Sequence, residues 1–158
     1  MKKGHPHIAL FEPLIPQNTG NIARIIAATG CRLHLITPLG FDLSDRQVRR
    51  AGLDYWPYLD LEVHSSLSNL TRLFKPSEIA WVSKFGQKSY LDVNIETTKL
   101  YVFGKETTGL PEAIRTKHLN QMFHLPMYHK EVRSLNLANS VAIITYHHLA
   151  GIYPAGNL

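Results

Sequence analysis

Residues 101–111 read YVFGKETTGLP, an apolar run followed by a polar loop with a glycine at each end. Residues 100–103 have the length and composition of a buried β-strand. Glycine lets a backbone approach a ligand or a neighbouring segment closely, and Pro111 suits the first position of a helical turn. The stretch therefore predicts a strand, a loop and a helix in that order. The loop is either a ligand-binding turn or an ordinary connection between the two elements.

The same alternation of strands and helices extends in both directions along the chain. Short apolar runs predict strands at residues 7–11, 33–36, 61–63, 79–82 and 123–125. Helices are predicted at residues 20–29, 44–50, 67–74 and 135–150. Residues 12–19 carry two prolines and are expected to form a loop, and Gly30 is expected to cap the first helix. This order predicts an α/β fold with a mostly parallel sheet flanked by helices, in a single domain over residues 1–158.

The composition narrows the class of partner. Seventeen Lys and Arg against twelve Asp and Glu give a net charge of +5, which favours a polyanion such as RNA, although many basic proteins bind no nucleic acid. Cys31 is the only cysteine, so no intrachain disulfide can form. The most apolar segment, residues 141–144, falls far short of the ~20 residues that span a bilayer. We expect a cytoplasmic protein with no membrane partner.

Two further polar segments accompany the loop at residues 104–109, and each follows a predicted strand, where open α/β sheets place their ligands. Residues 16–24 read PQNTGNIAR and enter a helix that carries Arg24. Residues 133–140 read RSLNLANS, in which Ser134 can cap the long last helix, with Asn136 in its first turn and Asn139 one turn further on. The alternative for both segments is a capped helix with solvated side chains.

Several other sites are disfavoured by spacing. The dinucleotide pattern Gly-x-Gly-x-x-Gly is absent, and Leu110-Pro111 stands where a phosphate loop needs Lys-Ser or Lys-Thr, so a nucleotide-dependent enzyme of Rossmann type is disfavoured. Adjacent His147 and His148 diverge on a helix, and no His-Glu-x-x-His pattern occurs among the nine histidines. We therefore expect no metal.

Taken together, the segments NTGNIAR (18–24), FGKETTGLP (103–111) and RSLNLAN (133–139) resemble the three signature motifs of SPOUT-superfamily RNA 2′-O-ribose methyltransferases. Local matches at residues 12–21, 49–55 and 151–154 resemble the TrmL (YibK-like) tRNA (cytidine/uridine-2′-O-)-methyltransferases within that superfamily. The resemblance covers essentially the whole chain. It departs from the usual Gly-Pro-Glu-Thr-Arg-Gly of the second motif at Lys105 and Thr108, which alters the charges beside the expected pocket.

The resemblance implies a SPOUT fold with a C-terminal trefoil knot, S-adenosyl-L-methionine (SAM) as cofactor and no metal. It also implies a homodimer with composite active sites, in which the first motif of one subunit faces the SAM of the other. The implied substrate is tRNA, methylated on the ribose 2′-hydroxyl of the wobble nucleotide 34, a cytidine or uridine, in leucine tRNAs. The alternatives are another tRNA or rRNA site, or an RNA-binding module that has lost catalysis.

The resemblance also assigns residues. Catalytic roles fall to Arg24, Asn18, Asn21, Glu106, Ser134 and Asn136. Cofactor contacts fall to Val82, Gly104, Glu106, Gly109, Leu110, Leu125, Ser134, Asn136 and Asn139. RNA contacts are expected from Arg46, Arg49, Arg50, Lys84, Lys105, Lys130 and Arg133. Because guanidinium stays protonated in proteins, we expect Arg24 to hold a phosphate and stabilise developing negative charge rather than act as a base.

Overall fold

The computed structural model describes residues 4–43, 55 and 58–153. Its centre is a seven-stranded sheet in the order β3-β2-β1-β6-β4-β7-β5, and every registered strand pair is parallel. The strands are β1 (His7–Phe11), β2 (Arg32–Ile36), β3 (Asp60–His64), β4 (Ile79–Val82), β5 (Lys88–Ser89), β6 (Leu100–Phe103) and β7 (Met122–His124). The predicted parallel α/β sheet is therefore confirmed.

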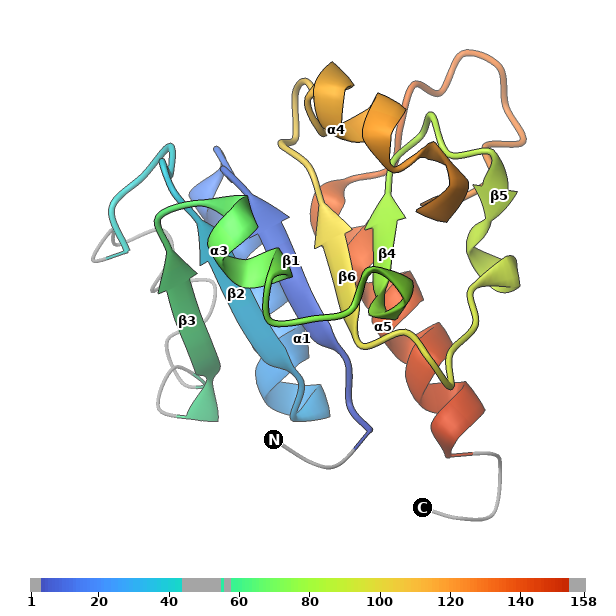
Figure 1. Ribbon diagram of the computed structural model, residues 1–158. Coiled ribbons are helices and arrows are strands. Elements are labelled where there is room, and N and C mark those ends of the chain that lie inside the picture. The colour runs from blue at the N-terminus through green and yellow to red at the C-terminus, as the bar shows by residue number, and fades with distance from the viewer. Residues whose placement is uncertain (1–3, 44–54, 56–57, 154–158) are drawn as a thin grey trace.

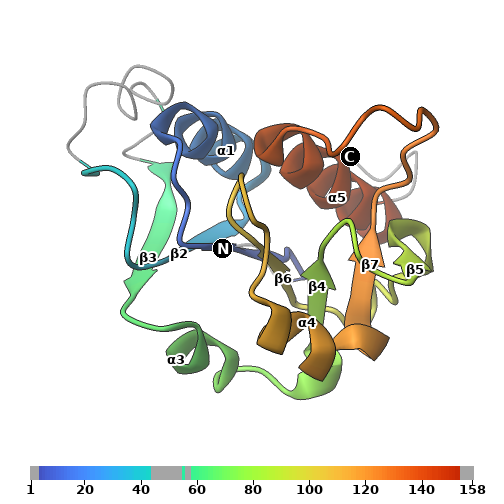
Figure 2. The same cartoon turned by 90° about the horizontal axis from the view of Figure 1, so that it is seen from above.

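Helices cover both faces of the sheet, as Figure 2 shows from above. The long helices α1 (Pro16–Thr29) and α5 (Leu137–Ile152) lie side by side on one face. The short helices α3 (Leu67–Thr71) and α4 (Glu112–Lys117) lie on the other. Single turns of 3₁₀ helix, η2 (Pro76–Glu78), η3 (Tyr90–Asp92) and η4 (Leu119–Gln121), occur in the connections. Within the part of the chain that the structure describes, no helix is long and apolar enough to cross a membrane.

The core is divided by the sheet into two layers. Alternate residues of β1 point to opposite faces, so Ile8 and Leu10 pack on the side of α1 and α5, whereas Ala9 and Phe11 pack on the side of α3. All of β4 and β6 is buried, which explains why these strands read as continuous apolar runs. The sheet is thus held from both sides, and its carboxyl-terminal edge has a fixed shape on which loops can be positioned.

Three strands, β1, β4 and β6, have the predicted bounds, and Gly30 caps α1 in the left-handed region at φ 67°, as predicted. The loop prediction for residues 12–19 is wrong in its second half, because α1 already begins at Pro16. A proline at the start of a helix loses no hydrogen bond, since the first N–H groups have no partner within the helix. The two-residue strand β5 was not predicted, because two residues carry no recognisable alternation.

The start of α5 also differs from the prediction. Ser134 was expected to cap this helix, but the helix begins at Leu137 and its N-cap is Asn136. The side-chain oxygen of Asn136 accepts hydrogen bonds from the backbone N–H groups of Ala138 (2.9 Å) and Asn139 (3.3 Å). Asparagine is as good an N-cap as serine, so sequence alone does not decide between the two positions. Similarly, Pro111 is the N-cap of α4 and not its first residue.

The far half of α5 is tied to the beginning of the described chain. The Nε2 of His148 lies 3.4 Å from the carbonyl oxygen of Gly4, to which it can only donate, so its Nδ1 accepts the hydroxyl hydrogen of Tyr101 at 2.8 Å. Burial raises the pKa of Tyr101, which keeps its hydroxyl protonated, and burial lowers the pKa of His148. At the same corner, His5 Nε2 lies 2.8 Å from Tyr153 Oη.

This corner predicts that the stability of the fold decreases in acid. The folded state keeps His148 neutral, whereas the unfolded chain binds a proton below the ordinary histidine pKa of 6.5. The stabilisation is therefore complete above pH 6.5 and is lost as the pH falls below it. We expect the melting temperature to drop between pH ~7.5 and ~5.5, and His148→Gln to make that drop smaller. His7 and His34, whose pKa values are also lowered, should leave part of the dependence in the variant.

Candidate functional site

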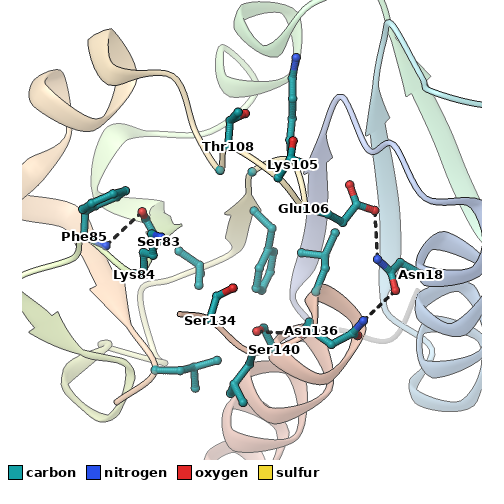
Figure 3. A pocket seen from close by; sticks show the side chains of 18 of the residues that line it. Asn18, Ser83, Lys84, Phe85, Lys105, Glu106, Thr108, Ser134, Asn136 and Ser140 are labelled. Carbon is teal, nitrogen blue, oxygen red and sulfur yellow. Dashed lines mark hydrogen bonds between the residues drawn. The ribbon is translucent and has the colours of Figure 1, made fainter. Parts of the chain in front are cut away.

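The main candidate site is a cavity of about 580 Å³ at the carboxyl ends of β4, β6 and β7 (Figure 3). Its lining comes from Ile15, Asn18, Val82, Ser83, Lys84, Phe85, Phe103, Gly104, Lys105, Glu106, Thr107, Thr108, Gly109, Arg115, Leu125, Met127, Ser134, Leu135, Asn136, Leu137 and Ser140. The three polar segments singled out in the sequence all contribute to this lining. Their predicted convergence on one cavity is therefore confirmed.

A hydrogen-bond network joins the three segments, and its side-chain links are drawn in Figure 3. The Oε2 atom of Glu106 accepts the backbone N–H of Leu14 at 2.8 Å, and Oε1 accepts that of Ile15 at 3.1 Å. Oε1 also accepts from Nδ2 of Asn18 at 3.2 Å, and Oδ1 of Asn18 accepts from Nδ2 of Asn136 at 2.9 Å. Because Asn136 also caps α5, the network fixes the start of that helix against the turn before α1.

The loop after β6 folds back on itself through its two glycines. A Cβ atom on Gly104 would lie only 2.2 Å from the backbone of Gly109 and Leu110, so no larger residue fits there. Gly109 has a φ of 70°, and its N–H and carbonyl both bond to Lys105, at 2.9 and 3.2 Å. The turn directs Leu110 into the core, where it is fully buried, and leaves Thr107 and Thr108 exposed.

The residues present fit SAM. Val82, Phe103, Leu125 and Met127 provide apolar walls that suit the flat faces of a purine. Side-chain amides and hydroxyls from Asn18, Ser83, Ser134, Asn136 and Ser140 provide hydrogen-bonding groups for a ribose and an amino-acid moiety. The volume lies within the range of about 300–1,000 Å³ that is typical of small-molecule sites.

The structure places the predicted site residues in three groups. The cavity lining includes Asn18, Val82, Lys84, Gly104, Lys105, Glu106, Gly109, Leu125, Ser134 and Asn136. Outside the lining are Asn21, Arg24, Leu110, Asn139, Lys130 and Arg133, of which all but the buried Leu110 are exposed. Arg46, Arg49 and Arg50, with the helix expected at residues 44–50, lie outside the described residues.

Arg24 lies on the exposed surface of α1. Its guanidinium carbon is 5.1 Å from the ring centroid of Tyr55, and its Nη2 donates to the Tyr55 hydroxyl at 3.4 Å. Cation–π contact of this kind orients a guanidinium while leaving its hydrogens available for a ligand. Arg24 is therefore held in place, but outside the cavity of its own chain.

Lys105, expected to contact RNA, is engaged within the chain. Its Nζ lies 2.5 Å from Oε2 of Glu12 and 5.8 Å from the ring centroid of Phe11. Glu12 directly follows β1 and has a φ of 46°, a backbone conformation that residues other than glycine rarely adopt. Lys105 and its neighbour Glu106 thus both attach the loop after β6 to the segment between β1 and α1.

Sequence analysis missed Phe85 and Arg115, which form a basic aromatic group with Lys84 at the cavity rim. The ring of Phe85, half exposed, has the guanidinium carbon of Arg115 4.2 Å from its centroid and the Nζ of Lys84 5.3 Å away. Residues 83–86 follow the buried strand β4. Because open α/β sheets bind ligands at the carboxyl ends of their strands, Phe85 could have been predicted as a site residue. Arg115 gave no such signal, because it comes from α4 and reaches the rim only in the folded chain.

The network around Glu106 predicts a stability loss on its removal. In Glu106→Gln, the new amide group faces hydrogen-bond donors, so at least one partly buried donor loses its acceptor. We expect the free energy of unfolding in urea to fall by about 1–3 kcal/mol. The exposed Glu96 serves as a control, because Glu96→Gln should stay within about 0.5 kcal/mol of the parent. Equal changes in the free energy of unfolding for the two variants would contradict a stabilising role of this network.

Comparisons with known proteins agree on one family. Residues 5–146 match the SpoU rRNA Methylase family. A Bacillus subtilis protein provisionally named tRNA (cytidine(34)-2′-O)-methyltransferase is 43% identical over 143 residues, which cover 89% of each chain. A solved structure described as giving structural insights into the 2-OH methylation of C/U34 on tRNA is 39% identical, with a TM-score of 0.85 over 94% of this chain and 97% of that chain. The SpoU methyltransferase AviRb from Streptomyces viridochromogenes, in complex with the cofactor AdoMet, shares the fold with a TM-score of 0.84 at 21% identity, over 98% of this chain and 60% of its own. The chain belongs to the SpoU rRNA methylase family.

Proposed function

We propose that this protein transfers the methyl group of SAM to the ribose 2′-hydroxyl of nucleotide 34, a cytidine or uridine, in tRNA. The observation that carries the proposal is the network Glu106–Asn18–Asn136, which brings all three motifs of a methyltransferase family to one cavity. The names of the relatives at 39–43% identity support the choice of nucleotide. The resemblance to TrmL-type motifs supports leucine tRNAs as the substrate, and we expect the reaction to take place in the cytoplasm.

The cavity residues would hold SAM by shape and by hydrogen bonds. When bound, SAM supplies a methyl group on a sulfonium that a ribose oxygen can attack. Val82, Phe103 and Leu125 would pack against its apolar parts, and Ser134 with Asn136 would bind its polar edge. The closed turn between Gly104 and Gly109 keeps this wall rigid. Rigid positioning of both reactants supplies much of the acceleration in reactions of this type.

Arg24 would act on the substrate. A 2′-hydroxyl must lose its proton as it attacks, so negative charge develops on the ribose oxygen. A fixed guanidinium close to that oxygen and to the adjacent phosphate would stabilise this charge. Lys84, Lys130 and Arg133 are exposed and would hold further phosphates, which orients the RNA without reading its sequence.

The position of Arg24 outside its own cavity supports a homodimer with composite sites. On α5, Ile143 and Tyr146 leave 38% and 58% of their surface exposed, although both are large and apolar. A twofold pairing along α5 would bury these side chains in both subunits. Since α1 lies beside α5, such a pairing would bring Arg24 of one subunit towards the cavity of the other.

We include the trefoil knot in the proposal, with the C-terminal segment threaded through a loop of the chain. Two contacts place the segment after β4 close to β7, as the parallel pairing of these two strands requires. The backbone N–H of Ser83 bonds to the carbonyl oxygen of Phe123 at 3.0 Å, and a Cβ on Gly86 would lie 2.5 Å from the backbone of Phe123. Threading would explain why the segment before α5 meets the loops after β4 and β6 in one cavity.

The reaction is tested by incubating the purified protein with SAM and a leucine tRNA, followed by nucleoside mass spectrometry and mapping of the methylated position. We expect 2′-O-methylation at nucleotide 34 and a rate about 10²–10³-fold lower for Arg24→Ala. Calorimetric binding of SAM to that variant should match the parent. Methylation of another tRNA position or of rRNA alone would overturn the substrate, and SAM binding without any methylation would indicate a silent binding module.

Composite sites are tested by mixing two inactive variants. Arg24→Ala removes the substrate-side group, and Ser134→Trp fills the cavity from an exposed position. After co-expression, half of the dimers should pair the two variants, and each such dimer has one intact site. We expect roughly a quarter of the parental activity to return. No recovery, with dimers present on size-exclusion chromatography, would show that each site lies within one subunit.

A further inference from the structure

A second group of ligating side chains lies on the outer strands of the sheet, β2 and β3. The parallel register places His34 opposite Glu62. Two residues further along both strands, His64 lies opposite Ile36 on the same face of the sheet. Because alternate residues share a face, His34, Glu62 and His64 all point to the side of the sheet that carries α3. None of the three lines the cavity described above.

The distances among their ligating atoms match a metal site. His34 Nδ1 and His64 Nε2 are 2.9 Å apart, and the two Glu62 carboxylate oxygens lie 3.8 Å from them, Oε2 from His34 and Oε1 from His64. Bonds of about 2.0–2.1 Å at tetrahedral angles separate ligand atoms by roughly 3.3–3.4 Å. The three distances bracket this value, so shifts of a few tenths of an ångström would suffice. We propose that His34, Glu62 and His64 bind a divalent transition-metal ion such as Zn²⁺.

His34 also contacts a second side chain through the ring nitrogen that would face away from the metal, as metal-binding histidines usually do. His34 Nε2 lies 2.8 Å from Nδ1 of His7, and the two rings stack with an interplanar angle of 8°. A histidine that binds a metal through Nδ1 carries its hydrogen on Nε2 and donates it to a neighbour. His7 can accept that hydrogen, and its own ring is held edge-on against Phe74. The orientation of His34 is thus set before any ion arrives.

The charges around the three ligands and the access to them also favour a metal ion. His34 is fully buried, so an ion bound there would be shielded from solvent on that side. Arg32 is a competing cation, but its Nε pairs with Asp60 at 2.9 Å, whereas its Nη1 is 3.9 Å from Glu62. The Glu62 side chain is half exposed, which leaves a path for an ion and room for a water as fourth ligand.

The proposed metal site is independent of the methyl-transfer reaction and differs from the expectation of no metal drawn from the sequence. The expectation of no metal rested on histidines that are close in sequence, such as His147 and His148. His34 and His64 are 30 residues apart and meet only because β2 and β3 pair in parallel. The alternative is a direct hydrogen bond between the two imidazoles, with no affinity for metal.

The test is calorimetric titration of ZnCl₂ into chelator-treated protein in a buffer that does not bind zinc. We expect about one ion per chain, and at least tenfold weaker binding for Glu62→Gln and for His64→Ala. Glu62→Gln keeps the size of an exposed side chain, so the fold should persist, and circular dichroism checks this. His129→Ala removes an exposed histidine elsewhere and should bind as the parent does. Co²⁺ in place of Zn²⁺ should give the visible absorption of a tetrahedral site, and that absorption should be lost in Glu62→Gln.

Two results would overturn the inference. One is the absence of heat and of bound zinc in the parent protein at high micromolar concentrations. The other is equal zinc binding by the parent, Glu62→Gln and His64→Ala, which would place the ion elsewhere on the chain.

Discussion

The carboxylate of Glu106 is the constraint on which the site depends. Two backbone N–H groups at the entrance to α1 and one side-chain amide donate to the same two oxygens, and the partly buried donors, Leu14 and Asn18, would be costly to leave unpaired. The donors belong to a turn that follows β1, whereas the acceptor follows β6, so the contact fixes two strand ends relative to each other. Through Asn18 and Asn136 the same contact sets where α5 begins.

The parallel sheet explains why polar chemistry gathers in two separate places. All carboxyl ends of the strands face one edge, so loops from β4, β6 and β7 meet there and enclose the cavity. The sheet also aligns residues across neighbouring strands, which brings imidazoles and a carboxylate together on β2 and β3. The first arrangement depends on loops and the second on the register of neighbouring strands.

Much of the fold followed from the sequence because its strands are buried on both faces. Residues 7–11, 79–82 and 100–103 form uninterrupted apolar runs, and such runs have sharp ends. Helix starts were harder to predict. Pro16 was taken as a loop residue although it opens α1, and Ser134 was preferred to Asn136 as a cap, because both residue types serve either role.

The three segments of the candidate site were predicted from the sequence, but the contacts that connect them were not. That Glu106 accepts from Leu14 and Ile15 depends on backbone groups, which have no signature in the sequence. The stacking of Arg115 on Phe85 and the meeting of His34 with His64 depend on tertiary contacts between residues about 30 positions apart. Periodicity describes single elements, so contacts of this kind follow only from the arrangement of the elements.

The hydrogen bond between His5 and Tyr153 has a consequence for chain topology. It places the two ends of the described chain side by side, as Figure 1 also shows at the lower edge of the molecule. Ends this close allow a short peptide to join them, so that new termini can be opened in a loop elsewhere, as in a circular permutant. Joined without a new opening, the backbone becomes a covalent ring. In the threaded topology proposed above, such a ring would keep its crossings even when fully denatured, because no free end remains to slip out.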